Sequence, residues 1–449
     1  MALTLLGRRQ LAQSETMSPS GVRQLAQRRL EDLLRFASSR SNLYAKRLSP
    51  RSIKAPLEAL PPLTRSELIS GFDDILTDHS VSAALARAEV DLRRSGRAQP
   101  GRAQPGRAWR HRWWLAATAG TTGDPAVFIW SRREWATVLA SYARAMRWAE
   151  VTIGPRSQLR MALVSTSVPT HQSAVVGASI RVPFVQTLTL DARSALERQV
   201  ERLNGFQPRV LVGYASALRQ LALAQLAGEL HVHPDAVMSA SEVLTAPTAA
   251  LLGRAWGRPP FDVYAATETA GIASMCTRGS RHLYSDLVVV EPVNADGSPT
   301  PLGTLSHHTL VTVLFSRTLP LIRYEMSDRI RLLDEPCDCG LPYPRIGELG
   351  GRAENTLLLP GDPDQSVQLD VDALGPIIEA FPVLGWQAAV RGDALALMVV
   401  PGLDLDEEAL TGALRRHLAQ TGTPASVSLR RVEAIPRTGL GKRVPIERP

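Results

Sequence analysis

The stretch Thr-Ala-Gly-Thr-Thr-Gly-Asp-Pro-Ala, residues 118–126, lies between two apolar segments and is rich in glycine and in hydroxyl side chains. Glycine lets a backbone approach a ligand closely, and N–H and hydroxyl groups can donate hydrogen bonds to phosphate oxygens. An ordinary turn between strands has the same composition, and no Gly-Lys-Ser/Thr follows as in a Walker loop. The residues predicted to hold phosphate are Thr118, Gly120, Thr121, Thr122 and Gly123. That prediction depends on further parts of a nucleotide site occurring downstream.

Length and composition indicate a globular protein of roughly two or three domains. The chain has 449 residues, of which 44% are hydrophobic. No apolar run reaches the roughly 18 residues that a membrane span needs, and the first nine residues are too short for a secretory signal. We therefore expect a cytoplasmic protein with no membrane association.

The charge is basic, with a formal net charge of +8. Much of the excess lies in an arginine-rich segment, residues 93–112, which contains a tandem Gly-Arg-Ala-Gln-Pro repeat. Punctuation by glycine and proline favours a flexible, solvated insertion over an arm for nucleic acid or an acidic partner. Elsewhere arginine is spread without interleaved aromatic residues. Nucleic-acid binding is therefore not expected.

Strands and helices alternate in the middle of the chain, which predicts an α/β domain with parallel strands. An amphipathic helix or two is expected over residues 19–48, and Thr64 with Glu67 has the spacing of a capping box. The predicted strands span residues 113–117, 127–130, 160–165, 183–188 and 210–212. The predicted helices span residues 133–150, 170–179, 194–204 and 216–228. Short strands and turns between residues 283 and 335 predict a β-rich subdomain.

The C-terminal part has a pattern of its own. Helices are expected near residues 371–380 and over 407–420, and strands over 387–391, 394–399 and 426–435. This set predicts a small, mobile α/β lid. We expect a core at residues 1–350, a hinge at 351–355 and the lid at 356–449.

Four polar positions downstream fit the remaining parts of a nucleotide site. Glu268 follows the strand-like Phe261–Tyr264 and can hold Mg²⁺, although a surface glutamate fits as well. Asp328 can accept hydrogen bonds from two ribose hydroxyls, unless it forms a surface salt bridge. Arg352 follows two glycines at the domain boundary, where it can contact the nucleotide. Lys442 lies in a glycine-punctuated basic loop, which suits a residue carried by a closing lid as well as an ordinary basic tail.

In this order the motifs resemble the adenylate-forming superfamily, and most closely its phenylacetate-CoA ligase-like branch. The resemblance covers most of the chain, from Ser41-Asn-Leu-Tyr44 to Lys442. It implies a large α/β core with a β-rich subdomain and a mobile C-terminal lid. It also implies ATP, Mg²⁺ and a small carboxylic acid as ligands, coenzyme A or another acceptor, and leaves a homodimer open.

The same resemblance assigns roles to residues. Lys442, Glu268 and Thr267 take catalytic positions, and Glu268 also binds Mg²⁺. Ser241 and Glu242 flank adenine, Asp328 binds ribose, and Glu354 is the hinge. Further nucleotide contacts fall to Tyr264, Ala265 and Arg352. By the same resemblance His171 faces the acid substrate, with a helix N-cap at Thr170 as the alternative for this segment. Tyr214 either lines the acyl pocket or is an ordinary core aromatic.

The chain departs from the family at the phosphate loop, where Ala119 replaces a usual serine and Asp124 and Ala126 stand where lysine is common. One phosphate-binding cation is therefore missing, and Arg132 or Arg133 is a candidate to replace it.

All three cysteines join a histidine in one pattern, which predicts a metal site. Cys276 and His282 are followed far downstream by Cys337 and Cys339. Three cysteines and one histidine form a structural zinc set that uses all four ligand positions. Three unrelated thiols in a reducing cytosol are the alternative.

We thus expect an AMP-forming ligase that activates an aromatic or small carboxylic acid as acyl-AMP and transfers it to coenzyme A. The same activation with an amine, a carrier protein or a nitrite-type nitrogen nucleophile as acceptor remains an alternative. A non-catalytic nucleotide-binding protein is the alternative from another class.

Overall fold

The computed structural model describes residues 2–95, 106–118, 125–153, 158–180, 183–360, 366–392, 394–422 and 425–447. The tandem Gly-Arg-Ala-Gln-Pro repeat of the predicted insertion lies outside these ranges. The helices are α1 (Ala2–Ser14), α2 (Pro19–Arg40), α3 (Asn42–Arg47), α4 (Arg65–Ser70), α5 (Phe72–Ile75), α6 (Ala83–Arg94), α7 (Arg132–Trp148), α8 (Gln172–Ser179), α9 (Leu196–Phe206), α10 (Ala215–Leu226), α11 (Ala246–Trp256), α12 (Gly375–Ile378) and α13 (Glu407–Gln420).

The strands are β1 (Trp113–Ala117), β2 (Val127–Ser131), β3 (Leu159–Ser165), β4 (Val185–Asp191), β5 (Val210–Gly213), β6 (Ala236–Ala240), β7 (Phe261–Ala266), β8 (Ala270–Met275), β9 (Arg281–Leu283), β10 (Val288–Val293), β11 (His308–Val313), β12 (Tyr324–Met326), β13 (Asp328–Leu333), β14 (Arg345–Arg352), β15 (Thr356–Pro360), β16 (Ser366–Asp370), β17 (Val383–Arg391), β18 (Ala394–Pro401) and β19 (Ser426–Arg431).

A nine-stranded sheet with the order β13-β14-β9-β8-β7-β6-β5-β3-β4 organises the larger part of the chain. Strands β3 to β7 pair in parallel with one another, whereas the pairs β7–β8, β8–β9, β9–β14 and β13–β14 are antiparallel. The expected alternation of strands and helices over residues 160–228 is confirmed by β3 to α10. Helices α10 and α11 connect consecutive parallel strands, and this places the loops at the strands' carboxyl ends together.

Local capping motifs set where two helices begin. The predicted capping box at Thr64 and Glu67 is present at the start of α4. Ser131 and Glu134 form a second box at the start of α7. In both cases side chains satisfy backbone N–H groups that the first helical turn leaves without partners.

The predicted β-rich region is confirmed, since β10, β11 and β12 form an antiparallel sheet and β13 joins the large one. Leu63, in the Pro-rich stretch before α4, pairs with Tyr324 of β12. This contact brings α4 to the edge of the β-rich region.

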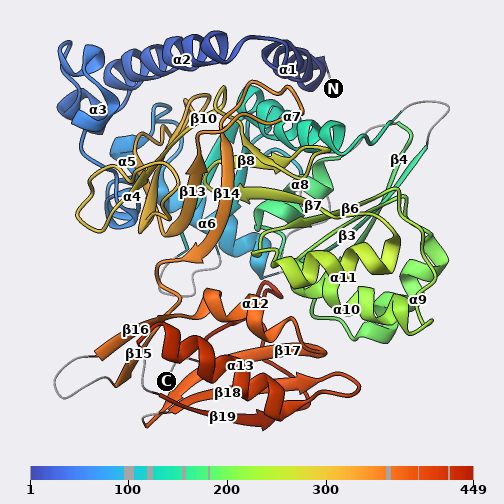
Figure 1. Cartoon of the computed structure of the whole chain (residues 1–449). Coiled ribbons are helices and arrows are strands. Elements are labelled where there is room, and N and C mark those ends of the chain that lie inside the picture. Colours follow the sequence, from blue (N-terminus) through green and yellow to red (C-terminus); the bar gives the residue numbers. More distant parts are fainter. Residues whose placement is uncertain are drawn as a thin grey trace.

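The C-terminal part packs around a core of its own, built by residues between Leu357 and Ile446. Strands β17 and β18 pair antiparallel, and β18, α13 and β19 form a unit with parallel strands. The expected helix over 371–380 is shorter, because a 3-10 turn at Val371–Leu374 precedes α12. Strand β14 runs from the large sheet toward this part, which lies at the opposite end of the molecule from α1 and α2 (Figure 1). We refer to residues 356–447 as the lid.

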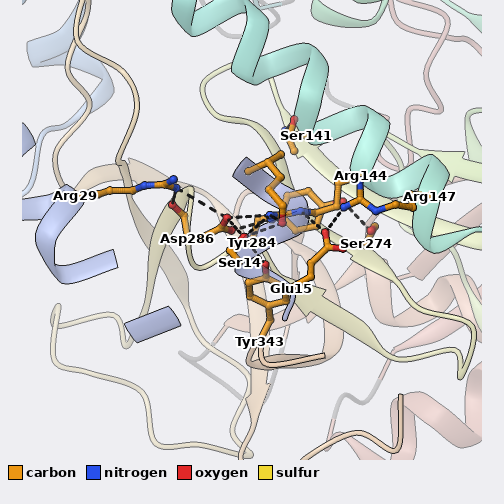
Figure 2. Close-up of polar contacts among 12 residues, drawn as sticks. Ser14, Glu15, Arg29, Ser141, Arg144, Arg147, Ser274, Tyr284, Asp286 and Tyr343 are labelled. Atoms are coloured by element: carbon orange, nitrogen blue, oxygen red, sulfur yellow. Dashed lines mark hydrogen bonds and ion pairs between the residues drawn. The ribbon is translucent and has the colours of Figure 1, made fainter. Parts of the chain in front are cut away.

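The N-terminal helices are tied to the sheet by a buried ionic cluster (Figure 2). Arg144 of α7 pairs with Asp286 through two contacts of 2.8 Å, and both side chains are fully buried. The hydroxyl of Ser14, at the end of α1, donates to Asp286 Oδ2 at 2.8 Å. The Arg144 guanidinium also lies over the rings of Trp148, Tyr284 and Tyr343. The cluster therefore joins α1, α7 and the segment after β9.

Within the described residues, none of the helices has both the length and the hydropathy needed to cross a membrane.

Candidate active site

Strand pairing places an acidic and a basic side chain opposite each other at one end of the sheet. Asp328 begins β13 and is paired in register with Arg352, the last residue of β14. The Arg352 Nε atom lies 3.4 Å from Asp328 Oδ1, and the Tyr264 hydroxyl donates to Oδ2 at 2.9 Å. Burial, followed by the Asp328 charge, raises the pKa of Tyr264 well above its ordinary value, so the hydroxyl stays protonated as a donor. Asp328 is thus fixed from both sides.

Glu268 lies in the tight turn between β7 and β8, close to this pair. Burial raises the pKa of its carboxyl group, and the Arg352 charge opposes that rise. Arg65, at the start of α4, also lowers the pKa of Glu268. Thr267 beside it is buried. A carboxylate in such surroundings gains from a cation, which is the property a Mg²⁺ ligand needs.

Lys442 reaches the same place from the lid. Its Nζ atom lies 5.8 Å from the centre of the Tyr214 ring. Burial, and then repulsion by Arg352, lowers its pKa to about 8, while Glu242, Asp328 and Glu268 act in the opposite direction. The backbone around it is held by a hydrogen bond from the Thr438 N–H to the Lys442 carbonyl at 3.0 Å. Lys442, Arg352, Asp328 and Glu268 therefore belong to one electrostatic cluster.

His171 and Tyr214 lie beside this cluster, at the ends of β3 and β5. The Nδ1 atom of His171 caps α8 and lies 2.9 Å from the Ser173 hydroxyl. Burial, then repulsion by Lys442 and Arg94, lowers the pKa of His171 to about 3, so its ring is neutral. The Tyr214 hydroxyl accepts a hydrogen bond from the Thr166 N–H at 3.1 Å. Histidine rather than Thr170 caps the helix.

Glu242 accepts hydrogen bonds from two backbone N–H groups, which its sequence context did not predict. Its Oε2 atom accepts from the Ser216 N–H at 2.8 Å, and its Oε1 atom accepts from the Arg443 N–H at 2.7 Å. The preceding Ser241 has a positive φ of 69°, which is unusual for a residue with a Cβ. The carboxylate is therefore engaged with backbone groups from α10 and from the lid loop.

Only the residues that flank the predicted phosphate loop are among the described residues. Gly120, Thr121, Thr122 and Gly123 lie outside the described residues. Thr118 precedes them, and its hydroxyl accepts from the Ala126 N–H at 3.0 Å. Arg94 donates to the Thr118 carbonyl at 2.9 Å and to the Thr170 hydroxyl at 3.0 Å. Arg94 is thus a cation at the described edge of this loop.

Arg132 and Arg133, the candidates to replace the missing lysine, are exposed at the start of α7, and their role stays a prediction. Arg94 and Arg65 escaped sequence reasoning since each lies far along the chain from the site it reaches. The capping box that fixes the start of α4 was the available signal for Arg65.

The hinge position Glu354 follows β14, and its carboxylate lies 3.3 Å from Arg352. Ala265 is part of β7, next to Tyr264. The predicted hinge at Glu354 and domain boundary at 350 stay predictions.

The three cysteines and His282 come together in space. Their ligand atoms all lie within 4.8 Å of one another. Cys276 Sγ is 3.9 Å from Cys337 Sγ, and Cys339 Sγ is 3.2 Å from His282 Nε2. Tetrahedral zinc with Zn–S bonds of about 2.3 Å would separate two sulfur atoms by roughly 3.8 Å. The His282 Nδ1 atom faces the Tyr343 carbonyl at 3.1 Å, which leaves Nε2 as the ligand atom. The donor set and spacing fit zinc, and the three thiols form no disulfide.

No family model matches the chain. The 2-hydroxyisobutyryl-CoA ligase in its postadenylation state has a similar structure, with a TM-score of 0.73 and 17% identity over 97% of this chain and 91% of that one. The chain thus has the fold of the adenylate-forming ligases.

Sequence relatives agree with this adenylate-forming fold. The phenylacetate-coenzyme A ligase of Thermus thermophilus is 24% identical over 255 residues, covering 55% of this chain and 56% of that protein. The phenylacetate-coenzyme A ligase of Escherichia coli K12 is 27% identical over 265 residues, with the same coverage. The chain thus matches little more than half the length of these relatives. The resemblance drawn from the motifs is confirmed.

Two states of the 2-hydroxyisobutyryl-CoA ligase resemble this chain to different degrees. The 2-hydroxyisobutyryl-CoA ligase in its thioesterification state matches the same 97% of the chain with a lower TM-score of 0.58, against 0.73 for the postadenylation state. The chain as a whole therefore superposes better on the postadenylation structure than on the thioesterification structure.

Proposed function

We propose that this protein activates a carboxylic acid with ATP, releasing pyrophosphate, and passes the acyl group from acyl-AMP to coenzyme A. The supporting observation is the convergence of Lys442 from the lid with Glu268, Asp328 and Arg352 from the core. The core supplies carboxylates for a metal ion and for ribose hydroxyls, and the lid supplies a cation. The names of the relatives, phenylacetate- and 2-hydroxyisobutyryl-CoA ligase, support an aromatic or small acid.

In the first step a carboxylate oxygen attacks the α-phosphorus of ATP, and the bond to the bridging oxygen of the β-phosphate breaks. Lys442 contributes positive charge where the carboxylate meets the α-phosphate, so it lowers the repulsion between two anions. Asp328, fixed by Tyr264 and Arg352, would accept the ribose hydroxyls. Glu268 would hold Mg²⁺, which supplies charge neutralisation on the phosphate oxygens when bound.

In the second step the thiolate of coenzyme A attacks the acyl carbon and AMP leaves. Lys442 lies over the Tyr214 ring in the present arrangement, and movement of the lid about Glu354 would carry it away and admit the thiol. An amine, a carrier protein or a nitrogen nucleophile could take the place of coenzyme A with the same first step. Phosphate binding by Thr118 and by residues 120–123 belongs to this proposal.

We also propose that Cys276, His282, Cys337 and Cys339 hold a structural zinc ion. Four protein ligands leave no coordination position for a substrate. The ion would therefore link β8 and β9 to the segment before β14. Free thiols gathered at a metal site favour a reducing compartment, and we place the protein in the cytoplasm on that ground.

The decisive experiment is acid-dependent exchange of labelled pyrophosphate into ATP, across a panel of aryl and small carboxylic acids. We expect exchange with at least one acid and a loss of at least 100-fold in Lys442→Ala, because a transition-state charge contact is removed. Lys54→Ala, at an exposed lysine of the core, is the matched control and should keep full exchange.

Absence of exchange with every acid, while ATP still binds, would show a non-catalytic nucleotide-binding protein. Product formation that does not require coenzyme A would instead favour one of the other acceptors.

A further inference from the structure

A buried polar interface joins the lid to helices α10 and α11 of the core. Its residues are Arg219, Glu242, Thr245 and Thr248 from the core and Glu379 and Arg443 from the lid, and we call them the clamp. A cavity of about 20 Å³ within the interface has room for roughly one water molecule. The clamp is thus closely packed although it consists of charged and hydroxyl groups.

Arg219 of α10 binds the lid through its main chain. Its guanidinium donates to the carbonyl groups of Glu379, Phe381 and Val383, each at 3.0 Å. A further N–H group donates to the Thr248 hydroxyl at 3.2 Å. Burial lowers the pKa of Arg219, and the Glu379 charge opposes that shift. The lid turn between α12 and β17 is therefore held by one core side chain.

Glu379 receives donors on both carboxylate oxygens. Its Oε2 atom accepts from the Thr245 and Thr248 hydroxyls, the latter at 2.7 Å, and both belong to the start of α11. Its Oε1 atom accepts from Trp386 at 3.1 Å and from Arg443 at 2.6 Å. Burial opposes the charge of Glu379, but Arg443 and the hydroxyl donors outweigh it and lower its pKa. The carboxylate is charged and fully satisfied.

The clamp continues directly to Lys442. Arg443, the next residue, lies 4.6 Å from the centre of the Trp386 ring. The N–H group of Arg443 donates to Glu242, which also accepts from Ser216 of α10. Side chain and main chain of Arg443 are thus fixed at once, one by Glu379 and the other by Glu242. The position of the Lys442 side chain follows from these anchors.

A polar interface of this kind fixes the position of the docked lid but contributes little net free energy to docking. Each hydrogen bond in the clamp is replaced by one to water when the lid moves away, so its net contribution to docking is small. Removing one partner alone is costly, since it leaves the other group buried without a partner. The docked lid is therefore defined in position and still able to leave.

We propose that Glu379 is a positioning residue for Lys442. The clamp then sets the fraction of molecules in which the lid is docked for acid activation and the fraction in which it is released for acyl transfer. This inference rests on the proposed function. Loss of the clamp should release the lid, so the step that needs Lys442 slows while the step that needs its departure does not.

The test uses Glu379→Gln, and Thr248→Val as a second variant from the core side. We expect pyrophosphate exchange to fall at least tenfold in both, while acyl transfer from the preformed adenylate to coenzyme A keeps its rate or rises. Thr248→Ser retains the hydroxyl and should restore exchange to within twofold of the native protein. Glu407→Gln breaks an exposed ion pair with Arg431 elsewhere on the lid and serves as the control.

Hydrogen–deuterium exchange over residues 379–385 and 436–447 reports docking without any activity. Faster exchange there in Glu379→Gln and Thr248→Val, with the helix α13 unchanged, is the expected result. Equal losses in both half-reactions together with unchanged deuterium uptake would overturn the inference. If the native protein shows no pyrophosphate exchange with any acid, the proposed function fails, and the deuterium uptake of the variants still decides whether the clamp holds the lid.

Discussion

At the scale of single residues, Lys442 combines the catalytic role proposed for it with a lowered pKa. Its pKa of about 8 lies below the ordinary value of a lysine because the side chain is buried and Arg352 is near. The ammonium form is the one that can neutralise anionic charge, and it predominates only below pH 8. This lysine therefore makes activity sensitive to mildly alkaline conditions.

We predict that kcat/KM for acid activation falls as the pH rises through about 8, approaching tenfold per pH unit, because the neutral amine cannot replace the ammonium ion. A pH profile of pyrophosphate exchange checks this. Lys442→Arg keeps its charge, so any remaining activity should lose this alkaline limb. A native profile that stays flat to pH 9.5 would contradict the assignment.

Gln172 is a buried polar side chain that lacks well-aligned hydrogen bonds within the described residues. The side chain is 4% exposed, and neither amide atom forms a well-aligned hydrogen bond among the described residues. Its polar neighbour is the Tyr142 hydroxyl, whose pKa burial raises and Gln172 lowers. Such a group costs about 1–3 kcal/mol in a folded protein.

We therefore expect Gln172→Met to raise the free energy of unfolding by about 1 kcal/mol, because the thioether fills the same space without buried polar atoms. Chemical denaturation measures this. Asn204→Met, where the native amide is hydrogen bonded on the surface, is the comparison and should not stabilise. A destabilised Gln172→Met would mean that the amide has partners in the folded chain.

The role of a residue could be predicted from sequence where a short motif brings together side chains of one chemistry. Cys337 and Cys339 are two positions apart, and a thiol cluster needs only a histidine to become a metal set. Glu242 could not be assigned in the same way, because its partners are the N–H groups of Ser216 and Arg443, which have no sequence signature. Arg65 and Arg94 reach the site only through the packing of α4 and α6.

At the scale of elements, helix α1 is held by the buried pair of Arg144 and Asp286 rather than by propensity. Ser14 and Glu15 at its end both contact this pair, and Arg29 of α2 approaches from the other side (Figure 2). Two fully buried charges are costly unless each has a partner. The helix thus depends on the cluster and the cluster on the helix.

Asp286→Asn should lower the free energy of unfolding by about 3–5 kcal/mol, since it leaves the Arg144 charge buried without its partner. Urea denaturation measures the loss, and limited proteolysis should show early cleavage near residues 15–18. Asp296→Asn, in an exposed turn after β10, is the control and should change stability little. Equal stability of both variants would show that the pair contributes nothing.

Elements of the α/β core could be predicted because buried parallel strands and amphipathic helices have strong patterns, as β5 and α10 show. Which strands lie next to one another in the sheet could not be predicted. Strand β14 enters the large sheet between β9 and β13, and this pairing alone sets Arg352 opposite Asp328. The pattern along one strand contains no information about the register with another.

At the scale of the whole molecule, core and lid have separate hydrophobic cores and meet through polar contacts. The cysteine and histidine cluster belongs entirely to the core, where His282 packs against Trp148 and Tyr343 beside the Arg144 cluster. A metal ion bound there would stabilise the native core by an amount set by its affinity. The lid would be affected only through docking.

Metal removal should therefore lower the unfolding temperature of the core and leave that of the lid nearly unchanged. We expect about one zinc ion per chain in the purified protein, measured by elemental analysis, because four ligands complete one tetrahedral site. Prolonged dialysis against a strong chelator, followed by calorimetry, should shift the core transition downward by several degrees, and added zinc should restore it. Cys339→Ser should reproduce the chelated state and no longer respond to zinc. Native protein that contains no zinc and melts identically with and without chelator would reduce the cluster to three free thiols beside a histidine.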